Sequence, residues 1–498
     1  LGDGGRPVRR GRRTRAQGAM SALDALVVGG GISGLATAHG LARAGLDVEL
    51  WEGALRVGGK IHTVERDGYL LESAATMVVN FRGALDGFLR GAQLDTKRRG
   101  RGPVSARYVL DADRLVAAPT GVGELLRTRL LSGGAKLRML AEPFAPRGRD
   151  RHESVAAFVT RRLGRELLDK LFDPYVAGPL ASDAALAEAR ATLPRLVALE
   201  KRYGSLALGA LCARLAGRGS AARPEVFSFS GGMATLTEHL AREGGFRVRR
   251  GVPVREAWPE RGGWRVRGGP ADAPRDTSCR HLVVSAPPQA AAEILRDVDA
   301  ALARLLASVR FAPIKVVHTG FERSRIGHAL NGSGFLVPSG SAFAANGCLW
   351  VSRLFSGCAP QDRVLLTSYL GGSRNPGAAA WDDARSSGEV MRMLHALLAA
   401  RGEPDVLHVE THERALPLYH GAYSATLAAM DERLGHLPGL HLEGNYRGGV
   451  SVRDRVACAQ SAAARIARQI TAARRPRGAN PGLSGAAVPA AQAALPIP

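Results

Sequence analysis

The chain has 498 residues, a net charge of +23, a hydrophobic share of 45% and five cysteines. This length exceeds the roughly 100–200 residues of one domain and predicts several lobes. Because the sequence has no run of about 18 apolar residues, we predict no membrane-spanning helix. No cysteine pair has the spacing of a metal or dithiol site, and no zinc-finger spacing or basic strand interleaved with aromatics occurs, so we predict no metal and no nucleic-acid partner.

The two ends of the chain are predicted to be disordered. Residues 1–19 form a basic leader rich in Gly and Arg, and residues 474–498 are mostly Pro, Gly and Ala, which bury too little apolar area to offset chain entropy. The leader lacks the apolar core of a secretory signal, yet its Arg-rich, acid-poor composition resembles an organelle transit peptide. We therefore expect a cytoplasmic protein, or a plastid or mitochondrial one if the leader is a targeting segment.

The first folded unit expected along the chain binds a dinucleotide. Residues 26–28 are typical of a buried parallel strand, residues 33–44 of a helix, and residues 47–50 of a second strand. Between the first strand and the helix, the pattern G-x-G-x-x-G is formed by Gly29, Gly30, Gly31, Ile32, Ser33 and Gly34. The first glycine permits a tight turn, the second lets a pyrophosphate approach the backbone, and the third lets the helix pack closely on the strand.

An acidic residue and a second glycine pair indicate which dinucleotide is bound. Glu52 ends the second strand, where a carboxylate accepts hydrogen bonds from ribose hydroxyls and disfavours the 2′-phosphate of NADP. The residues that follow include Arg56, Gly58, Gly59 and Lys60. A second glycine pair so close to the acid suits a backbone that wraps a longer cofactor carrying an isoalloxazine ring. We therefore predict one non-covalently bound FAD per chain.

The pattern changes in character further along the chain. Residues 120–220 have apolar positions at helical spacing, residues 225–290 are mixed, and residues 300–375 contain strand-like runs at 314–321 and 364–370. We find no Ser-His-Asp or Cys-His arrangement, and the 13 histidines are scattered. Oxidation by a flavin needs a positioned substrate in a dry site and no side-chain nucleophile, which agrees with this pattern.

Taken together, the two glycine motifs resemble the extended fingerprint of the flavin amine oxidase superfamily, which includes porphyrinogen oxidases and carotenoid desaturases. Between about residues 23 and 470, several stretches resemble the protoporphyrinogen oxidase family more specifically. Residues 173–178 are similar to its D-P-F-V-A-G stretch, with Tyr175 at the Phe position, and residues 231–233 to its G-G-M turn. Residues 444–452 resemble the segment that closes over the flavin in that family.

The resemblance implies an α/β fold of three lobes. We expect a Rossmann-type FAD-binding domain built discontinuously, a helical lobe that contacts a membrane, and an α+β substrate-binding domain with an antiparallel sheet. The expected ranges are 20–97, 223–297 and 411–473 for the FAD domain, 98–222 for the helical lobe, and 298–410 for the substrate domain.

The resemblance also assigns cofactor contacts. The first glycine motif and Glu52 hold the adenosine diphosphate half, and Val254 meets the adenine through its backbone. A helix starting near Val452 points its amides at the pyrimidine carbonyls. The residues expected around the flavin ring are Arg56, Gly58, Gly59, Lys60, Ala74, Ala75, Thr76, Met77, Asn445, Val450, Ser451 and Val452.

Substrate contacts follow in the same way. Arg107 falls where the family places an arginine that binds a propionate, and the apolar wall is expected from Gly334, Phe335 and Leu336. Two departures stand out. The chain reads G-S-G-F-L-V-P where the family reads G-F-G-x-L-V-P, and Lys315 resembles the amine oxidase lysine that holds a water at the flavin. Lys315 therefore either reaches the surface or acts at the flavin.

The resemblance implies oxidation of protoporphyrinogen IX to protoporphyrin IX in haem biosynthesis, removing six electrons with oxygen as acceptor and hydrogen peroxide as product. A coproporphyrinogen III oxidase, an amine oxidase, and a flavin-binding protein without turnover are the alternatives. Besides the tetrapyrrole and oxygen, or another electron acceptor, we expect a peripheral membrane contact, and a homodimer is compatible with the resemblance. Arg127, Arg129, Lys136 and Arg138 interleave with leucines in a basic amphipathic pattern that favours the membrane contact.

Overall fold

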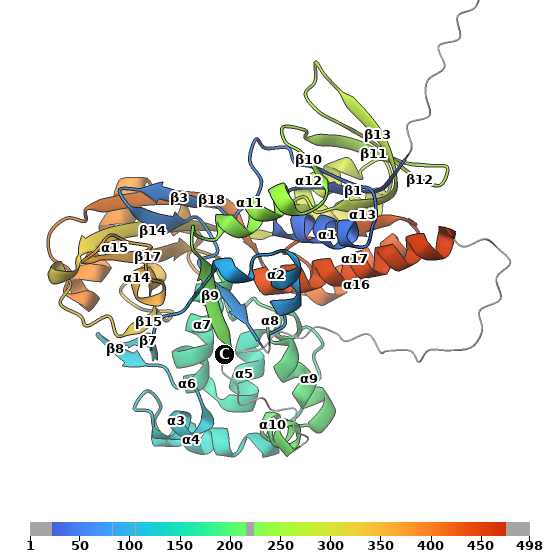
Figure 1. The fold of residues 1–498 in the computed structure, drawn as a ribbon. Helices are drawn as coiled ribbons and strands as arrows, with labels where there is room; N and C mark the ends of the chain where they lie inside the picture. The colour runs from blue at the N-terminus through green and yellow to red at the C-terminus, as the bar shows by residue number, and fades with distance from the viewer. Residues whose placement is uncertain (1–21, 82, 105, 216–223, 475–498) are drawn as a thin grey trace, which may run out of the picture.

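The computed structural model describes residues 22–474, apart from residues 82, 105 and 216–223. These residues form three lobes (Figure 1). The predicted leader at 1–19 and the predicted tail beyond Arg474 lie outside the described residues. No helix in the described part of the chain is long and apolar enough to cross a membrane.

The first lobe is built on a sheet whose strands come from three separate parts of the sequence. Its order is β10-β2-β1-β13-β12-β11, and β19 also pairs with β13. All six residues of β1 are buried, as expected for a parallel strand covered on both faces. The strands are β1 (Leu23–Val28), β2 (Val48–Trp51), β10 (Arg247–Arg249), β11 (Val254–Glu260), β12 (Gly263–Gly268), β13 (Arg275–Val284) and β19 (Leu440–Leu442).

Helices cover both faces of this sheet. The helices α1 (Ile32–Arg43) and α17 (Val452–Arg474) pack together on one face, and the other face is covered by α12 (Pro288–Ile294), α13 (Ala300–Ala307) and α16 (Tyr423–Gly435). The observed bounds of β1, α1 and β2 lie close to the predicted strand, helix and strand. The α/β fold with a discontinuous Rossmann-type domain is thereby confirmed.

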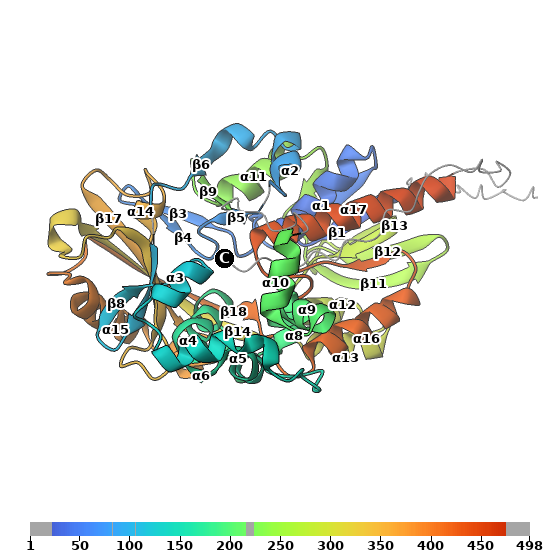
Figure 2. The same cartoon turned by 90° about the horizontal axis from the view of Figure 1, so that it is seen from below.

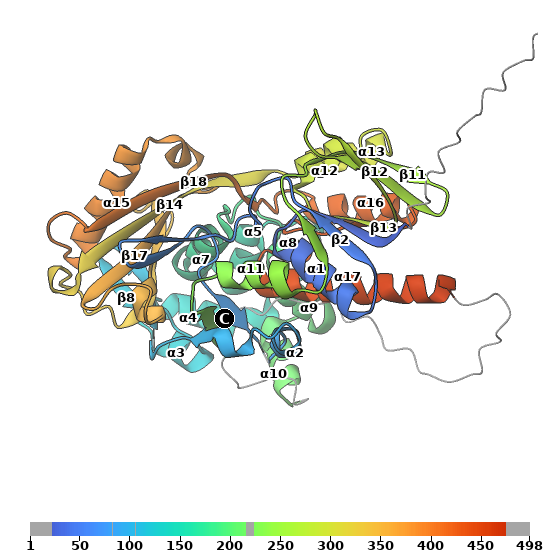
Figure 3. The same cartoon turned by 45° about the horizontal axis from the view of Figure 1, so that its top comes forward.

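The second lobe contains a mixed sheet in the order β18-β14-β17-β16-β15-β7-β8, in which β15 and β7 are parallel. One of its faces is covered by α15 (Asp383–Leu398), and Figure 3 shows the paired strands β14 and β18 extending from this lobe toward the first. The strands are β7 (Ala106–Asp111), β8 (Arg114–Ala117), β14 (Phe311–Glu322), β15 (Gly332–Leu336), β16 (Ala345–Trp350), β17 (Arg363–Gly371) and β18 (Val406–Pro417).

Two expected boundaries differ from this arrangement. The hairpin β7–β8 joins the second sheet, although residues 98–222 were all expected in the helical lobe. Likewise β18 continues in this sheet past residue 410. In both cases strand pairing with residues far away in sequence decides the lobe, and helical periodicity in the neighbouring residues carries no information about such pairing.

The third lobe is helical and lies below the other two in Figure 1 and toward the viewer in Figure 2. Ser132 and Ser154 begin two of its helices as N-caps, accepting hydrogen bonds from the backbone amides of Ala135 and Ala157. Its helices are α3 (Val122–Arg127), α4 (Gly133–Leu140), α5 (Val155–Leu163), α6 (Arg165–Leu167), α7 (Asp173–Leu180), α8 (Ala189–Thr192), α9 (Pro194–Tyr203) and α10 (Leu206–Leu215), with a π-helical turn at Leu168–Phe172.

A buried ion pair holds this lobe together. Arg162 is fully buried, forms an ion pair with Glu142, and donates hydrogen bonds to the carbonyls of Ala145 at 2.8 Å and Gly204 at 2.9 Å. Glu142 in turn accepts from the amide of Leu206 at 2.9 Å, at the start of α10. The pair therefore fixes α10 against α5.

Smaller elements connect the lobes. The pair β3–β4 and the three-stranded sheet β5-β9-β6 lie between the first and second lobes, close to α11. These elements are β3 (Thr63–Arg66), β4 (Tyr69–Glu72), β5 (Val78–Asn80), β6 (Arg98–Gly100), β9 (Glu225–Phe229), α2 (Asp86–Gly91), α11 (Ala234–Glu243) and α14 (Val351–Leu354).

Candidate cofactor and substrate site

The glycine turn between β1 and α1 has the geometry of a phosphate cradle. Gly29 has φ of +104°, and a Cβ there would lie 2.8 Å from the carbonyl oxygen of Ser285. A Cβ on Gly34 would overlap the carbonyl oxygen of Gly29, whereas a Cβ on Gly31 would meet no atom within 4 Å. The turn is therefore tight at its first and third glycines and open at the second, where a pyrophosphate is expected to approach.

The N-terminus of α1 faces this open space without a competing anion. No side chain caps α1, and its first turn, which includes Ile32 and Ser33, holds no acidic residue. Helix N-terminal amides of this kind favour a phosphate group. The residues present therefore fit the diphosphate of a dinucleotide.

Glu52 is tied to the glycine turn from the neighbouring strand. Its Oε2 accepts a hydrogen bond from Gly30 N at 2.6 Å, and its Oε1 accepts one from Ala54 N at 2.8 Å. Each oxygen keeps a further lone pair for a ribose hydroxyl. The amide of Val252 donates to Glu52 O at 2.9 Å, which places Val254 at the start of β11 just beyond this acid. The structure thus brings the predicted ribose and adenine contacts together.

The second glycine pair packs directly on the first. Gly58 N donates to Gly30 O at 2.8 Å, and the two turns form an isolated parallel bridge between Gly31 and Gly58. Gly59 also lies close, because its Cβ would be 3.4 Å from the Cα of Gly31. Arg56, in contrast, is exposed and donates a hydrogen bond to the neighbouring carbonyl of Val57 at 3.4 Å. The structure places Arg56 at the rim of this group.

Lys60 is half-buried beside an aromatic ring. Its Nζ lies 5.0 Å from the ring centroid of Phe311, at the start of β14. Burial lowers the pKa of Lys60 to about 8. Lys60 therefore carries a proton that it releases more readily than an exposed lysine.

The stretch from Ala74 to Met77 crosses from β4 to β5 and touches the second sheet. Thr76 Oγ1 and Tyr369 Oη share a hydrogen bond of 3.3 Å, and His412 Nε2 donates to Ser73 O at 2.7 Å. Tyr369 and His412 stand opposite Val316 and Ile314 of β14, on one face of the second sheet. This face therefore looks toward the residues expected to line the flavin. The position of Tyr369, hydrogen-bonded to a residue expected to line the flavin, was not predicted from sequence.

Glu72 links the same stretch to the G-G-M turn. Its carboxylate accepts hydrogen bonds from Met233 N at 2.8 Å and Thr63 Oγ1 at 2.9 Å. Burial nevertheless raises the pKa of Glu72 to about 7. This buried carboxyl joins β4, β3 and α11 around the site.

The C-terminal segment, residues 444–452, lies against the first lobe and completes the expected flavin site. Tyr419 Oη donates to Asn445 O at 3.4 Å, and half-buried Val450 packs on the core of the first lobe. Ser451 caps α17, accepting from Asp454 N at 3.2 Å through its Oγ. Because Asp454 adds a carboxylate to the first turn of α17, part of the positive helix end expected at Val452 is already offset.

Lys315 points away from these residues. It pairs with Leu370 of β17 on the face covered by α15, and its Nζ donates to Asp383 Oδ1 at 2.7 Å. The Lys315 side chain is only 6% exposed, but its partner Asp383 is 69% exposed, so the lysine ends just beneath a surface carboxylate. Of the two predicted alternatives for Lys315, the structure shows the surface one.

Arg107 lies on β7, on the face of the strand that is turned toward α7. Its neighbour Tyr108 packs against Trp350 in the core beneath α15, with ring centroids 5.6 Å apart, so Arg107 projects from the opposite face of the strand. Arg107 is half-buried, and burial lowers its pKa. No carboxylate among the described residues forms an ion pair with it. A guanidinium in this position is costly unless an anion joins it.

The predicted apolar wall divides between two faces of β15. Phe335 is buried in the core beneath α15, in an edge-on contact with Trp350, and so does not face the site. Leu336 lies on the other face, where its Cδ2 is 2.6 Å from the place that a Cβ on Gly178 of α7 would occupy. Gly334 pairs with Leu349 and brings the two strands together. The prediction for Phe335 is therefore wrong, because side chains alternate along a strand.

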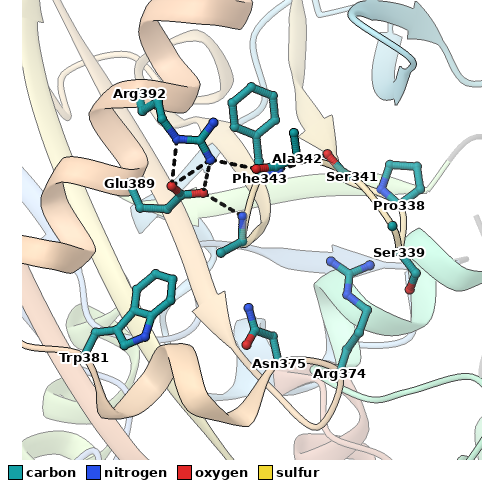
Figure 4. Close-up of a pocket in the computed structure, with 12 residues that line it drawn as sticks. Pro338, Ser339, Ser341, Ala342, Phe343, Arg374, Asn375, Trp381, Glu389 and Arg392 are labelled. Carbon is teal, nitrogen blue, oxygen red and sulfur yellow. Dashed lines mark hydrogen bonds and ion pairs between the residues drawn. The ribbon is translucent and has the colours of Figure 1, made fainter.

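A separate hollow of about 580 Å³ opens beside the β15–β16 loop and α15. Figure 4 shows Arg374 and Asn375 on one side of it and Glu389 with Arg392 on the other. Arg392 is already bound to Glu389, and Arg374 to the carbonyl of Val337 at 2.9 Å. None of the predicted site residues lines this hollow, which is therefore distinct from the expected cofactor site.

Comparison with known proteins agrees with this geometry. A family model described as flavin containing amine oxidoreductase matches residues 32–467. The chain belongs to this family. As a member of this flavin-containing family the chain is an FAD-dependent oxidoreductase, and the open turn at Gly31 and the uncapped α1 fit the diphosphate of that cofactor.

Individual relatives of this flavin oxidoreductase are similar over most of its length. The mitochondrial protoporphyrinogen oxidase of Nicotiana tabacum is 31% identical over 464 residues, covering 87% of this chain and 92% of that relative. The coproporphyrinogen III oxidase of Bacillus subtilis (strain 168) is 25% identical over 449 residues, covering 86% and 94%. The crystal structure of a protein from Exiguobacterium sp. 255-15 has a TM-score of 0.75 at 24% identity, covers 90% of this chain and 100% of that chain, and shows the same fold.

Proposed function

We propose that the chain oxidises protoporphyrinogen IX to protoporphyrin IX, with oxygen as electron acceptor. The observation that carries this proposal is the 31% identity to a protoporphyrinogen oxidase along 87% of the chain. The structure adds a half-buried Arg107, which forms no ion pair with any described residue, on a strand beside apolar Leu336; this suits an apolar ring that carries a carboxylate.

The side chains of this site bind and orient the substrate. The bound flavin would supply the hydride acceptor. Arg107 holds a propionate by bidentate hydrogen bonds, and Leu336 packs against the ring and excludes water from that side. Glu52 and the turn at Gly31 would hold the adenosine diphosphate half and so position the cofactor in the first lobe.

The proposal is tested by offering a porphyrinogen and, separately, an amine to the flavin-loaded protein without oxygen. Protoporphyrinogen IX is expected to bleach the flavin absorbance band quickly, and readmitted oxygen is expected to restore it with release of peroxide. Putrescine serves as the amine control and is expected to leave the band unchanged. Bleaching by the amine alone, or by no compound, would refute the proposal.

Coproporphyrinogen III is the second candidate substrate, because a relative named for that oxidase activity matches 86% of the chain. This substrate carries two more propionates on the same ring. The ratio of kcat/KM for the two porphyrinogens decides between the candidates. We expect it to favour protoporphyrinogen.

We further propose that the helical lobe rests on an anionic membrane surface and that the protein works there as a peripheral enzyme. Figures 1 and 2 both place α3, α4 and α10 on the side of this lobe that faces away from the sheets. The exposed apolar side chains on these helices and the turn after α4 are Leu126, Leu137, Leu140, Phe144, Leu208, Leu211 and Leu215. Phe144 is 90% and Leu215 79% exposed, as in proteins that insert side chains into the lipid interface.

Basic residues accompany this apolar group. Arg127, Arg129 and Arg214 are exposed beside it, whereas Arg138 bends inward and donates to the carbonyl of Arg162. Exposed cations attract an anionic lipid surface. Of the four basic positions predicted from sequence, Arg127 and Arg129 are therefore exposed, whereas Lys136 is half-buried and Arg138 points inward.

Vesicle sedimentation tests the membrane contact. The full chain is expected to sediment with vesicles that contain anionic phospholipid, and the double variant Phe144→Ser/Leu215→Ser is expected to remain in the supernatant. Leu407→Ser is the matched control, because Leu407 is exposed on β18, in another lobe. Equal sedimentation of all three proteins would contradict the proposal.

A further inference from the structure

Tyr175 is a residue of α7 for which the cofactor and the reaction so far give no role. It replaces the phenylalanine of the D-P-F-V-A-G stretch that this sequence resembles, so the chain carries a hydroxyl where the pattern has none. Tyr175 stands one helical turn before Gly178, and residues three apart lie on the same helix face. Gly178 lies against Leu336 of β15 and the carbonyl of Asn346 in β16, so this face of α7 looks toward these two strands.

Arg107 approaches the same place from the sheet. It projects from the face of β7 opposite to Tyr108, which is the face that looks toward α7. Val109, two residues from Arg107 on the same face of β7, pairs with Leu336, and Leu336 contacts Gly178, one turn from Tyr175. The charges of Arg107 and Arg453, the latter in the first turn of α17, both act to lower the pKa of Tyr175 against the effect of burial. The hydroxyl therefore lies near both the proposed propionate site and the expected flavin contact.

Both groups lack a protein partner suited to them. No described residue forms a hydrogen bond with Tyr175 Oη, and no described carboxylate pairs with Arg107. Burial raises the pKa of Tyr175, with Arg107 and Arg453 opposing this effect, so the hydroxyl keeps its proton at neutral pH. A protonated phenol beside a guanidinium offers two donors to one anion.

We propose that Tyr175 is a specificity-determining residue, whose hydroxyl donates a hydrogen bond to the same substrate carboxylate that Arg107 binds. This inference rests on the proposed oxidation of a carboxylate-bearing porphyrinogen. The two donors come from different lobes, Arg107 from the sheet and Tyr175 from the helices. The carboxylate would thus be held at the junction between them, which sets the orientation of the ring toward the flavin.

The test compares Tyr175→Phe with Tyr108→Phe. Both variants lose only a hydroxyl, but Tyr108 lies on the other face of β7, where its Oη donates to Asn331 at 2.7 Å. With protoporphyrinogen IX, Tyr175→Phe is expected to raise KM about tenfold, the size of one charge-assisted hydrogen bond, at unchanged kcat. With the dimethyl ester of protoporphyrinogen IX, which has no carboxylate, the same variant is expected to equal the wild type.

The outcomes separate this inference from the function on which it rests. An unchanged KM in Tyr175→Phe, or an equal rise for the dimethyl ester, overturns the role of Tyr175 while the wild-type oxidation stands. Failure of the wild type to oxidise any porphyrinogen overturns the proposed function and this inference with it. Titration of the oxidised proteins with protoporphyrin IX gives a readout without turnover, and here the expected change is about tenfold weaker binding by Tyr175→Phe alone.

Discussion

The backbone amide of Gly30 donates a hydrogen bond to Glu52 Oε2 at 2.6 Å, across 22 positions of the sequence. This bond joins the phosphate turn after β1 to the acid after β2. It fixes the distance between the two places where the cofactor is held, and Glu52 therefore has both a structural and a binding role.

Replacing Glu52 by Gln is expected to weaken FAD binding by about tenfold to a hundredfold. The amide side chain is neutral and can accept with only one of its two atoms, so a charge-assisted hydrogen bond worth about 1.5–3 kcal/mol is lost. Flavin titration of the apoprotein by fluorescence quenching measures this. Glu65→Gln, on exposed β3, is the control and should bind flavin as the wild type does.

Two glycine substitutions in the turn are expected to differ in kind. Gly34→Ala should destabilise the apoprotein by about 3 kcal/mol, because its Cβ overlaps Gly29 O. Gly31→Ala should unfold at the wild-type temperature without flavin and yet bind flavin poorly, because its Cβ enters open space that the phosphates need. Thermal unfolding with and without FAD distinguishes the two, and normal flavin affinity in Gly31→Ala would place the diphosphate elsewhere.

Lys315→Met is expected to leave kcat and the flavin spectrum within about twofold of the wild type. The lysine bonds Asp383 on the α15 face, and a partly exposed pair of this kind contributes about 1 kcal/mol or less. Stopped-flow reduction of the flavin provides the measurement. A fall of a hundredfold or more would revive the amine oxidase alternative.

The buried carboxyl of Glu72 is expected to make stability depend on pH. Because burial raises its pKa to about 7 from the ordinary 4.5, the folded protein holds this proton more tightly than the unfolded chain. The stabilisation is present below pH 4.5 and is lost as pH rises toward 7. Glu72→Gln cannot ionise, so its unfolding temperature relative to the wild type should increase between pH 5 and pH 7. A pH-independent difference would contradict this.

Arg162→Met is expected to destabilise the helical lobe by about 3–5 kcal/mol, because the substitution leaves the buried carboxylate of Glu142 unpaired. Limited proteolysis within residues 120–215 and thermal unfolding report the loss. Arg165→Met removes an exposed pair with Asp169 and should leave the unfolding temperature close to that of the wild type. Similar effects of the two variants would show that Arg162 is not a stabilising centre.

The first βαβ unit could be predicted from sequence because its information is local. Gly29, Gly31 and Gly34 each meet a backbone requirement set within a few residues, and the apolar runs around them have the period of their elements. The same holds for Glu52, which ends a strand. The sequence motif therefore predicted the backbone geometry of this part of the site correctly.

The rest depended on contacts between distant residues. The face to which Phe335 points is set by the pairing of β15 with β16, and the partner of Lys315 lies in α15. The hairpin at Ala106–Ala117 joins a sheet whose other strands start two hundred residues later. For Tyr175 a signal was available, because the hydroxyl departs from the family pattern, but its proximity to Arg107 required the fold.

The interleaving of the first lobe has a consequence for synthesis on the ribosome. The edge strand β19 pairs with β13, and α17, the last described helix, covers apolar residues of α1 near the opposite end of the chain. Both other lobes have therefore emerged from the ribosome before the strand and helix that complete this nucleotide-binding sheet are synthesised. Truncation before Leu440 leaves α1 without its cover, so holdase protection during translation and late cofactor loading are expected of this architecture.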